Sequence, residues 1–180
     1  MIRVIGGAFK GRRLRLVRSP LVRPMPAKLR ESLFNILKEK VKDAVVLDGF
    51  AGTGAVGIEA LSRGAARAVF VDEYYPAVKI IKENLARCEA EDRARVVHKE
   101  FNRAVIQLAK ESATFDLIFL DPPYRLLDER NPLKVVKKRN ILKPNGFVVL
   151  RHFFKTIPDQ KYFKLQRTVT IGDDTLSFFC

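Results

Sequence analysis

A glycine-rich loop in the first third of the chain constrains the fold more than any other feature. Residues 52–57 read Gly-Thr-Gly-Ala-Val-Gly, and the apolar run at residues 45–47 before them predicts a buried strand. A helical pattern over residues 55–62 follows at once. Between a strand and a helix, glycines at this spacing allow a tight turn and let a ligand approach the backbone closely. The loop therefore predicts an α/β fold with a ligand bound beside it.

Strand and helix patterns alternate along the rest of the chain. Further helices are expected at residues 27 to about 40, around 78–88, at 101–110 and at 133–139, and further strands at 68–71, 95–98, 115–120 and 147–151. A Lys-Pro-Asn-Gly turn at residues 143–146 is expected to separate the last helix from the last of these strands. Short connections with right-handed crossovers then predict a mostly parallel, doubly wound sheet with helices on both faces.

The end of the chain breaks this alternation. Two strand-like runs, residues 162–171 and 175–179, are joined by Gly172-Asp173-Asp174 with no helix between them. These runs predict an antiparallel hairpin. A parallel sheet that ends in such a hairpin is typical of the Rossmann-like fold of class I methyltransferases, and this is the α/β fold class that we predict.

The first 26 residues form a small, strongly basic extension, and the main domain is predicted to cover residues 27–180. Residues 1–30 carry nine Lys and Arg residues and no acid, in a chain with a net charge of +14. Leu14 and Leu16 alternate with basic residues, as in a short strand. So localised a charge indicates a polyanion as partner, although a solvated charged face remains the alternative. The predicted nucleic-acid contacts are Lys10, Arg12, Arg13, Arg15 and Arg23.

Other features of the composition indicate where the protein works. The longest apolar runs, such as residues 147–150, are far shorter than the ~20 residues that span a bilayer, and no apolar signal core stands at the N-terminus. Cys88 and Cys180 lack the spacing of metal ligands or of a disulfide framework, which fits two reduced thiols. We therefore expect a cytoplasmic monomer without membrane contact and without a metal.

Acidic residues beside the glycine loop narrow the choice of cofactor. Asp48 ends the strand before the loop, where a carboxylate would repel a pyrophosphate but suits the ammonium of a methionine group. Asp72 ends the next strand with no Arg beside it, so its two oxygens can accept both ribose hydroxyls. We predict S-adenosylmethionine as cofactor, with a nicotinamide cofactor or a merely structural turn as alternatives. The cofactor-binding residues predicted here are Asp48, Phe50, Gly52, Thr53, Gly54, Asp72 and Glu73.

The fourth strand of the main domain ends in Asp121-Pro122-Pro123-Tyr124, at the carboxyl edge where open sheets bind ligands. The exocyclic amine of a base is a poor nucleophile because its lone pair is delocalised into the ring. The Asp121 carboxylate and the Pro122 carbonyl are two acceptors that can hold both N–H bonds of such an amine. Pro123 stiffens the loop, and Tyr124 offers a face for base stacking. These four residues are the predicted catalytic residues, unless the motif is only a turn.

Four segments of the chain together resemble a known family almost from end to end. The segments are 3–14, 23–35, 50–65 and 172–179, the most specific being Phe-Ala-Gly-Thr-Gly at 50–54 with Gly-Ile-Glu-Ala-Leu-Ser-Arg-Gly-Ala at 57–65. They resemble the bacterial-type small-subunit (16S) ribosomal RNA (guanine-N2)-methyltransferases. The resemblance implies methyl transfer from S-adenosylmethionine to guanine N2 in ribosomal RNA, within an assembling small subunit. It also implies that Glu100 lies at the adenine pocket.

Three positions depart from the family pattern. Met25 and Ala27 stand where the family has Thr and Asp, which removes two polar contacts expected near the methionine end of the cofactor. Gly49 stands where a bulky apolar residue is usual. Two rival functions stay open: a DNA adenine-N6 methyltransferase, and a non-catalytic RNA-binding assembly factor that retains a cofactor pocket. The former normally needs a sizeable module for base readout, and thirty basic-rich residues are few for that task.

Overall fold

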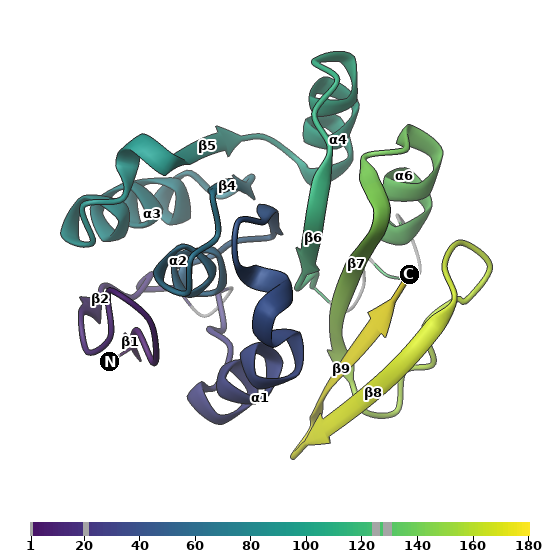
Figure 1. The fold of residues 1–180 in the computed structure, drawn as a ribbon, viewed down its shortest axis with the longest axis horizontal. Helices are drawn as coiled ribbons and strands as arrows, with labels where there is room; N and C mark the ends of the chain where they lie inside the picture. The colour runs from purple at the N-terminus through teal and green to yellow at the C-terminus, as the bar shows by residue number, and fades with distance from the viewer. Residues whose placement is uncertain (1, 20–21, 124–126, 128–130) are drawn as a thin grey trace.

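The computed structural model describes residues 2–19, 22–123, 127 and 131–180. Its centre is a seven-stranded sheet in the order β5-β4-β3-β6-β7-β9-β8 (Figure 1). Adjacent strands from β5 to β7 are parallel, whereas β9 runs antiparallel to both β7 and β8. The predicted parallel sheet with a closing antiparallel hairpin is thus confirmed. The strands are β3 (Val45–Gly49), β4 (Arg67–Asp72), β5 (Ala94–His98), β6 (Phe115–Leu120), β7 (Leu142–Phe153), β8 (Leu165–Ile171) and β9 (Asp174–Phe179).

Helices cover both faces of the sheet, as a doubly wound fold requires. α1 (Ala27–Leu37), α2 (Ala55–Ser62) and α3 (Tyr75–Arg87) pack on one face, and α4 (Phe101–Lys110) and α6 (Pro132–Arg139) pack on the other. The expected helix over residues 27–40 is α1 followed by a 3-10 helix, Lys38–Val41, and a second 3-10 helix covers Glu91–Arg93.

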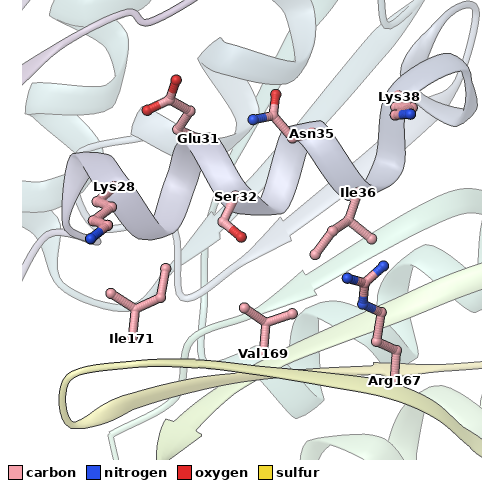
Figure 2. Close-up of a pocket in the computed structure, with 9 residues that line it drawn as sticks. All are labelled: Lys28, Glu31, Ser32, Asn35, Ile36, Lys38, Arg167, Val169 and Ile171. Carbon is pink, nitrogen blue, oxygen red and sulfur yellow. The ribbon is translucent and has the colours of Figure 1, made fainter.

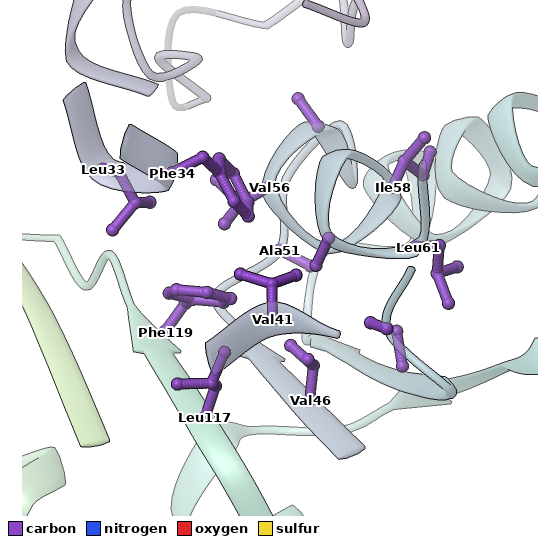
Figure 3. Packing of buried hydrophobic residues seen from close by; sticks show 14 of the residues in the cluster. Leu33, Phe34, Val41, Val46, Ala51, Val56, Ile58, Leu61, Leu117 and Phe119 are labelled. Atoms are coloured by element: carbon purple, nitrogen blue, oxygen red, sulfur yellow. The ribbon is translucent and has the colours of Figure 1, made fainter. Parts of the chain in front are cut away.

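Side chains of the central strands alternate between the two hydrophobic clusters, because successive strand residues point to opposite faces. Val46 belongs to the cluster under α1 and α2, and Leu47 belongs to the cluster under α4 and α6. The rings of Phe34 from α1 and Phe119 from β6 lie 6.0 Å apart in the first cluster (Figure 3). Burial on both faces explains why these strands read as continuous apolar runs in the sequence.

The turn expected at residues 143–146 was a wrong prediction, because these residues lie inside β7. They form a bulge: Phe115 of β6 pairs with Leu142, and Leu117 pairs with Phe147. Asn145 takes the left-handed conformation with φ 63°, which asparagine tolerates better than most residues. The turn-forming residues therefore bend a strand instead of ending one.

The basic N-terminal segment, residues 2–19 and 22–26, is fastened to the main domain by buried polar groups of α2. Glu59 is fully buried, and its two carboxylate oxygens accept the backbone N–H groups of Ile5 and Gly6, each at 2.8 Å. Strands β1 (Ile2–Arg3) and β2 (Arg13–Leu14) pair antiparallel in this segment. The expected strand is shorter than predicted, since Leu16 lies beyond β2 and is 39% exposed. Division of the chain at residue 26 stays a prediction.

No helix within the described part of the chain is long and apolar enough to cross a membrane.

Candidate active site at the carboxyl edge of the sheet

Three carboxylates stand at the ends of three adjacent strands. Asp48 is on β3, Asp72 ends β4, and Asp121 directly follows β6. In the sheet β3 lies between β4 and β6, and Asp48 pairs in register with Phe70 of β4 and Phe119 of β6. The predicted cofactor-binding and catalytic acids are therefore neighbours at one edge, where parallel sheets bind their ligands.

Asp72 holds the glycine loop in place with both of its carboxylate oxygens. Oδ2 accepts the N–H of Gly52 at 2.7 Å, and Oδ1 accepts the N–H of Tyr74 at 2.8 Å. Burial raises the pKa of Asp72, and the bonds from Tyr74 and Gly52 oppose that rise. Because each carboxylate oxygen has two lone pairs, one acceptor position remains on each oxygen for a ligand hydroxyl.

Gly52 and Gly54 adopt left-handed backbone conformations, with φ of 56° and 75°, which side chains with a Cβ rarely take. The N–H of Gly54 donates to the carbonyl of Ala51 at 2.7 Å, and helix α2 begins at the next residue. The sequence motif thus forms the strand-to-helix turn for which its glycines were singled out.

Asp48 lies beneath this turn and is only 3% exposed. Its Oδ2 accepts the N–H of Gly57 in the first turn of α2 at 2.8 Å. Burial raises the pKa of Asp48 to about 8; the bond from Gly57 opposes the rise, and the nearby charges of Asp121 and Asp72 add to it. A carboxyl group with this pKa is mostly protonated at neutral pH and would gain most from a cationic partner.

Phe101 explains the departure from the family pattern at Gly49. A Cβ built on Gly49 would lie 2.5 Å from the Phe101 ring and 3.1 Å from Leu120, so these side chains fill the space of the usual bulky residue. Phe50, which takes a positive φ of 63°, stacks on Phe101 with ring centroids 4.8 Å apart. The other departing positions differ in burial, since Met25 is 8% exposed among core residues and Ala27 is exposed at the start of α1.

Glu100 is the N-cap of α4. Its side chain accepts the backbone N–H groups of Asn102 at 3.1 Å and Arg103 at 3.0 Å. Glu73 is exposed after β4, and its carbonyl lies 3.0 Å from the His98 ring nitrogen Nε2. The roles of Glu100 and Glu73 in cofactor binding stay predictions.

Asp121 is held by a buried arginine that the sequence did not reveal. Arg151, in the buried part of β7, is 4% exposed and donates through Nη1 to Asp121 Oδ2 at 2.8 Å. The same guanidinium binds Asp174 at the start of β9, with Nε donating to Oδ1 at 3.0 Å. Burial raises the pKa of Asp121, and the charge of Arg151 opposes that rise.

The signal that could have revealed Arg151 is a charged residue placed directly after the apolar run of β7, since a buried charge requires a partner. Next to Asp121, Pro122 is buried and Pro123 is exposed. Tyr124, the fourth predicted catalytic residue, lies outside the described residues.

A fully buried asparagine connects the glycine loop to the basic N-terminal segment. Asn84 of α3 donates through Nδ2 to the carbonyls of Thr53 at 2.9 Å and Arg15 at 3.1 Å. Its Oδ1 accepts the N–H of Arg15 at 2.7 Å. Sequence reasoning missed this residue because an asparagine in an amphipathic helix is usually solvated. The segment that carries the predicted RNA contacts is therefore bonded through one side chain to the predicted cofactor loop.

The predicted nucleic-acid contacts differ in how their charges are used. Arg12 forms an ion pair with Glu89 at 3.0 Å and Arg15 forms one with Glu83 at 2.5 Å, so α3 partly neutralises both. No ion pair is found within the described residues for the other three, all exposed: Lys10, Arg13 and Arg23. The positive charge of Arg23 lies close enough to Asp121 to oppose, slightly, the rise that burial causes in the pKa of that carboxyl group.

The chain is similar to known proteins over most of its length. The model of the family described as conserved hypothetical protein 95 matches residues 2–180. The chain is 38% identical over 151 residues to the Bacillus subtilis protein named "Putative rRNA methyltransferase YlbH", covering 84% of this chain and 82% of that protein. It is 40% identical over 149 residues to ribosomal RNA small subunit methyltransferase D of Escherichia coli K12, covering 82% of this chain and 69% of that protein.

The fold is also similar to solved structures of proteins described as methyltransferases. The Escherichia coli structure described as "Putative methyltransferase yhhF" superposes with a TM-score of 0.83 at 31% identity, covering 99% of this chain and 96% of that one. A more distant structure, described as the S-adenosylmethionine-dependent methyltransferase from Agrobacterium tumefaciens, shares the fold with a TM-score of 0.66 at 20% identity, covering 90% of this chain and 64% of that one.

Proposed function

The chain belongs to the family described as conserved hypothetical protein 95, and from this premise we propose that it methylates the exocyclic N2 amine of a guanine in small-subunit ribosomal RNA. The proposed substrate is the RNA of an assembling small subunit, and the enzyme acts as a monomer. One observation carries the proposal: Asp121 follows a strand adjacent to the one that bears Asp48, so an acceptor for an amine stands beside the predicted cofactor loop. The names of the relatives that methylate ribosomal RNA support the substrate class.

S-adenosylmethionine is the methyl donor, and the residues at the carboxyl edge fit it. The left-handed turn at Gly52 and Gly54 exposes backbone rather than side chains to a ligand, and the free acceptor positions of Asp72 suit the two ribose hydroxyls. Asp48 suits the ammonium group, since its raised pKa means that a nearby cation would stabilise its ionised form. When bound, the sulfonium supplies an electrophilic methyl group, and the protein contributes position and electrostatics.

Asp121 and the Pro122 carbonyl position the target amine. Two acceptors on its two N–H bonds draw the nitrogen lone pair out of conjugation with the ring and towards the methyl group. Transfer would break the S–CH3 bond of the sulfonium, which leaves as a neutral thioether, and would form the N–C bond. Positive charge would then develop on the nitrogen, where the ionised Asp121 stabilises it until one N–H proton is lost to water. Arg151 favours the ionised form of Asp121, because its charge opposes the rise in pKa that burial causes, and it fixes one carboxylate oxygen by donating to Oδ2. The other oxygen, Oδ1, remains for the amine.

Mass-spectrometric nucleoside analysis tests this function. Wild type and Asp121→Asn are incubated with deuterium-labelled S-adenosylmethionine and either naked small-subunit RNA, assembling small-subunit particles, or double-stranded DNA. We expect labelled N2-methylguanosine from RNA or particles with wild type, and a loss of about 100-fold or more with Asp121→Asn.

Two other results would overturn the proposal. Labelled N6-methyladenine from DNA would indicate the rival DNA enzyme. Cofactor binding by calorimetry together with no product from any substrate would indicate an assembly factor that retains the cofactor pocket.

A further inference from the structure

A groove of about 620 Å³ runs between α1 and the edge strand β8, on the face of the sheet that also carries the N-terminal segment. In Figure 2 the α1 residues Lys28, Ser32 and Ile36 face the β8 residues Ile171, Val169 and Arg167 across the groove. The predicted and proposed roles assigned above leave this groove unused.

The groove combines positive charge with unused polar groups. Lys28, Lys38 and Arg167 are all exposed, and none forms an ion pair within the described part of the chain. Ser32 and Asn35 add neutral polar side chains, and Glu31 is the one acid among the lining residues. Half-buried Ile36, Val169 and Ile171 supply the apolar part of the lining. A lining of this kind suits a polyanion whose sugars or bases can also contact aliphatic side chains.

One end of the groove lies next to the candidate active site. Ile171 pairs in register with Asp174 across the hairpin, and Asp174 shares the guanidinium of Arg151 with Asp121. From Lys28, opposite Ile171, α1 leads away to its last residue, Leu37, about 14 Å along the helix axis at 1.5 Å per residue, and Lys38 follows directly. An RNA strand whose target base lies at Asp121 could therefore leave the active site along this positively charged groove.

The groove is also continuous with the N-terminal segment. Buried Arg30 of α1 donates through Nη2 to the carbonyl of Arg3 at 2.7 Å, so α1 stands between the segment and β8. A single RNA molecule on this face could contact both surfaces.

We propose that the groove between α1 and β8 binds single-stranded RNA flanking the target nucleotide, with its phosphates on Lys28, Lys38 and Arg167. The proposal rests on the proposed function, since it assigns a second contact surface to the same substrate. The residues that line the groove include no aromatic side chain, so phosphate contacts rather than base stacking hold the strand. Binding in the groove is therefore salt-dependent and tolerant of sequence.

The test compares two triple charge reversals of equal net charge. The groove variant carries Lys28→Glu, Lys38→Glu and Arg167→Glu; the control carries Arg67→Glu, Arg103→Glu and Lys110→Glu, which are exposed and lie outside the groove. RNA affinity is measured without cofactor over a range of salt concentrations, on a small-subunit RNA fragment with a single-stranded flank. We expect the groove variant to lose at least tenfold in affinity and to flatten the slope of log affinity against log salt by about 2, at about 0.7 per phosphate contact. The control should lose less than threefold.

Two further measurements separate the possible failures. Both variants should bind S-adenosylmethionine as wild type does, and removal of the single-stranded flank from the RNA should erase the difference between them. Equal RNA affinity of the groove variant and the control would overturn the groove proposal, as would a wild-type dimer that only the groove variant dissociates. A wild-type protein that binds this RNA through the groove but methylates no guanine would instead overturn the proposed function.

Discussion

The cofactor side and the target side of the carboxyl edge are built in different ways. On the cofactor side, Asp48 and Asp72 accept backbone N–H groups from residues at most twenty positions away. On the target side, Asp121 is held by the side chain of Arg151, thirty positions later, which Asp174 of the hairpin also binds. The geometry of the cofactor side depends on one strand–loop–helix unit and the strand beside it. The geometry of the target side depends on the correct pairing of β7 with β9.

This difference predicts separable defects. Damage to the target side should reduce methyl transfer and leave the cofactor loop intact. Damage to the cofactor side should weaken binding of S-adenosylmethionine, but the enzyme that has bound the cofactor should still transfer the methyl group at the wild-type rate.

The largest effect is expected from Arg151→Met, which removes the shared partner of two carboxylates. Breaking a buried ion pair by removing one partner costs about 3–5 kcal/mol, because the remaining charges lose their compensation. Chemical denaturation should show a loss of stability in this range, and turnover should fall with it. Arg151→Lys should recover part of the stability but less of the turnover, since lysine lacks the two-sided geometry of the guanidinium. A stable, fully active Arg151→Met would disprove the coupling of the hairpin to the site.

Asp121→Asn should have the next largest effect, confined to chemistry. Loss of one group that stabilises developing charge typically lowers the rate about 100- to 1,000-fold. The amide keeps the shape of the side chain, so affinity for S-adenosylmethionine should stay within about threefold, as expected for an interaction made mainly in the transition state. Rapid-quench measurement of labelled methyl transfer gives the rate. Turnover within tenfold of wild type would remove Asp121 from the mechanism.

Asp72→Ala should impair the cofactor side and leave the target side intact. It leaves the N–H groups of Gly52 and Tyr74 without acceptors and removes the proposed ribose contact, so affinity for S-adenosylmethionine should fall by about 1–3 kcal/mol. Calorimetry measures the loss, with Asp92→Ala as the control, since Asp92 is exposed and has no predicted role in cofactor binding. Unchanged affinity in Asp72→Ala would place the cofactor elsewhere.

The pH dependence of cofactor binding should report Asp48. Its pKa of about 8 lies above the ordinary value, so the folded protein keeps a proton that the unfolded chain loses, and this contribution to stability declines as the pH rises from about 4 to about 8. Binding pairs the ionised carboxylate with the protonated ammonium group, so affinity for S-adenosylmethionine should rise roughly tenfold between pH 6 and pH 7 and fall again above about pH 8, where the ammonium group loses its proton. Asp48→Asn should flatten both profiles. A wild-type profile identical to that of Asp48→Asn would contradict the assigned role.

The smallest effect is expected at the N-terminal segment, and the structure changes which residues should be tested. Arg12 and Arg15 are already paired with Glu89 and Glu83. The double variant Arg12→Gln, Arg15→Gln should therefore alter the salt dependence of RNA binding little. The triple replacement of Lys10, Arg13 and Arg23 by Gln should flatten the slope of log affinity against log salt by about 2. The opposite ranking in a filter-binding assay would show that the pairs with α3 open on RNA binding.

Most of the fold could be predicted from the sequence, because buried parallel strands and amphipathic helices have distinct apolar periods. Helices α2 and α4 and strand β6 have the same first and last residues in the structure as in the prediction from the sequence. The turn at 143–146 was wrong because a proline, an asparagine and a glycine signal a backbone bend, and the sequence does not say whether the strand continues beyond it. Pairing of β6 with β7 on both sides of the bulge makes it continue.

The candidate site could be predicted only where its residues are close in sequence. Asp48, Gly52 and Gly54 belong to one loop, and Asp121 follows an apolar run, so each carries a local signal. Asn84 carries no such signal, and the charge of Arg151 after an apolar run indicates that it needs a partner but not which one. The partners of both are distant residues, brought near by the hairpin and by α3. The space at Gly49 of β3 could not be read from the sequence either, since Phe101 fills it from helix α4.

The central claim, that two separately built halves serve binding and chemistry, is tested most directly by single-turnover rates at rising concentrations of S-adenosylmethionine. Asp72→Ala should approach the wild-type rate once the cofactor is saturating, because only its affinity is reduced. Asp121→Asn should saturate at the wild-type concentration and remain about 100-fold slower or more. An Asp72→Ala rate that stays low at saturation, or an Asp121→Asn rate that excess cofactor restores, would contradict the account.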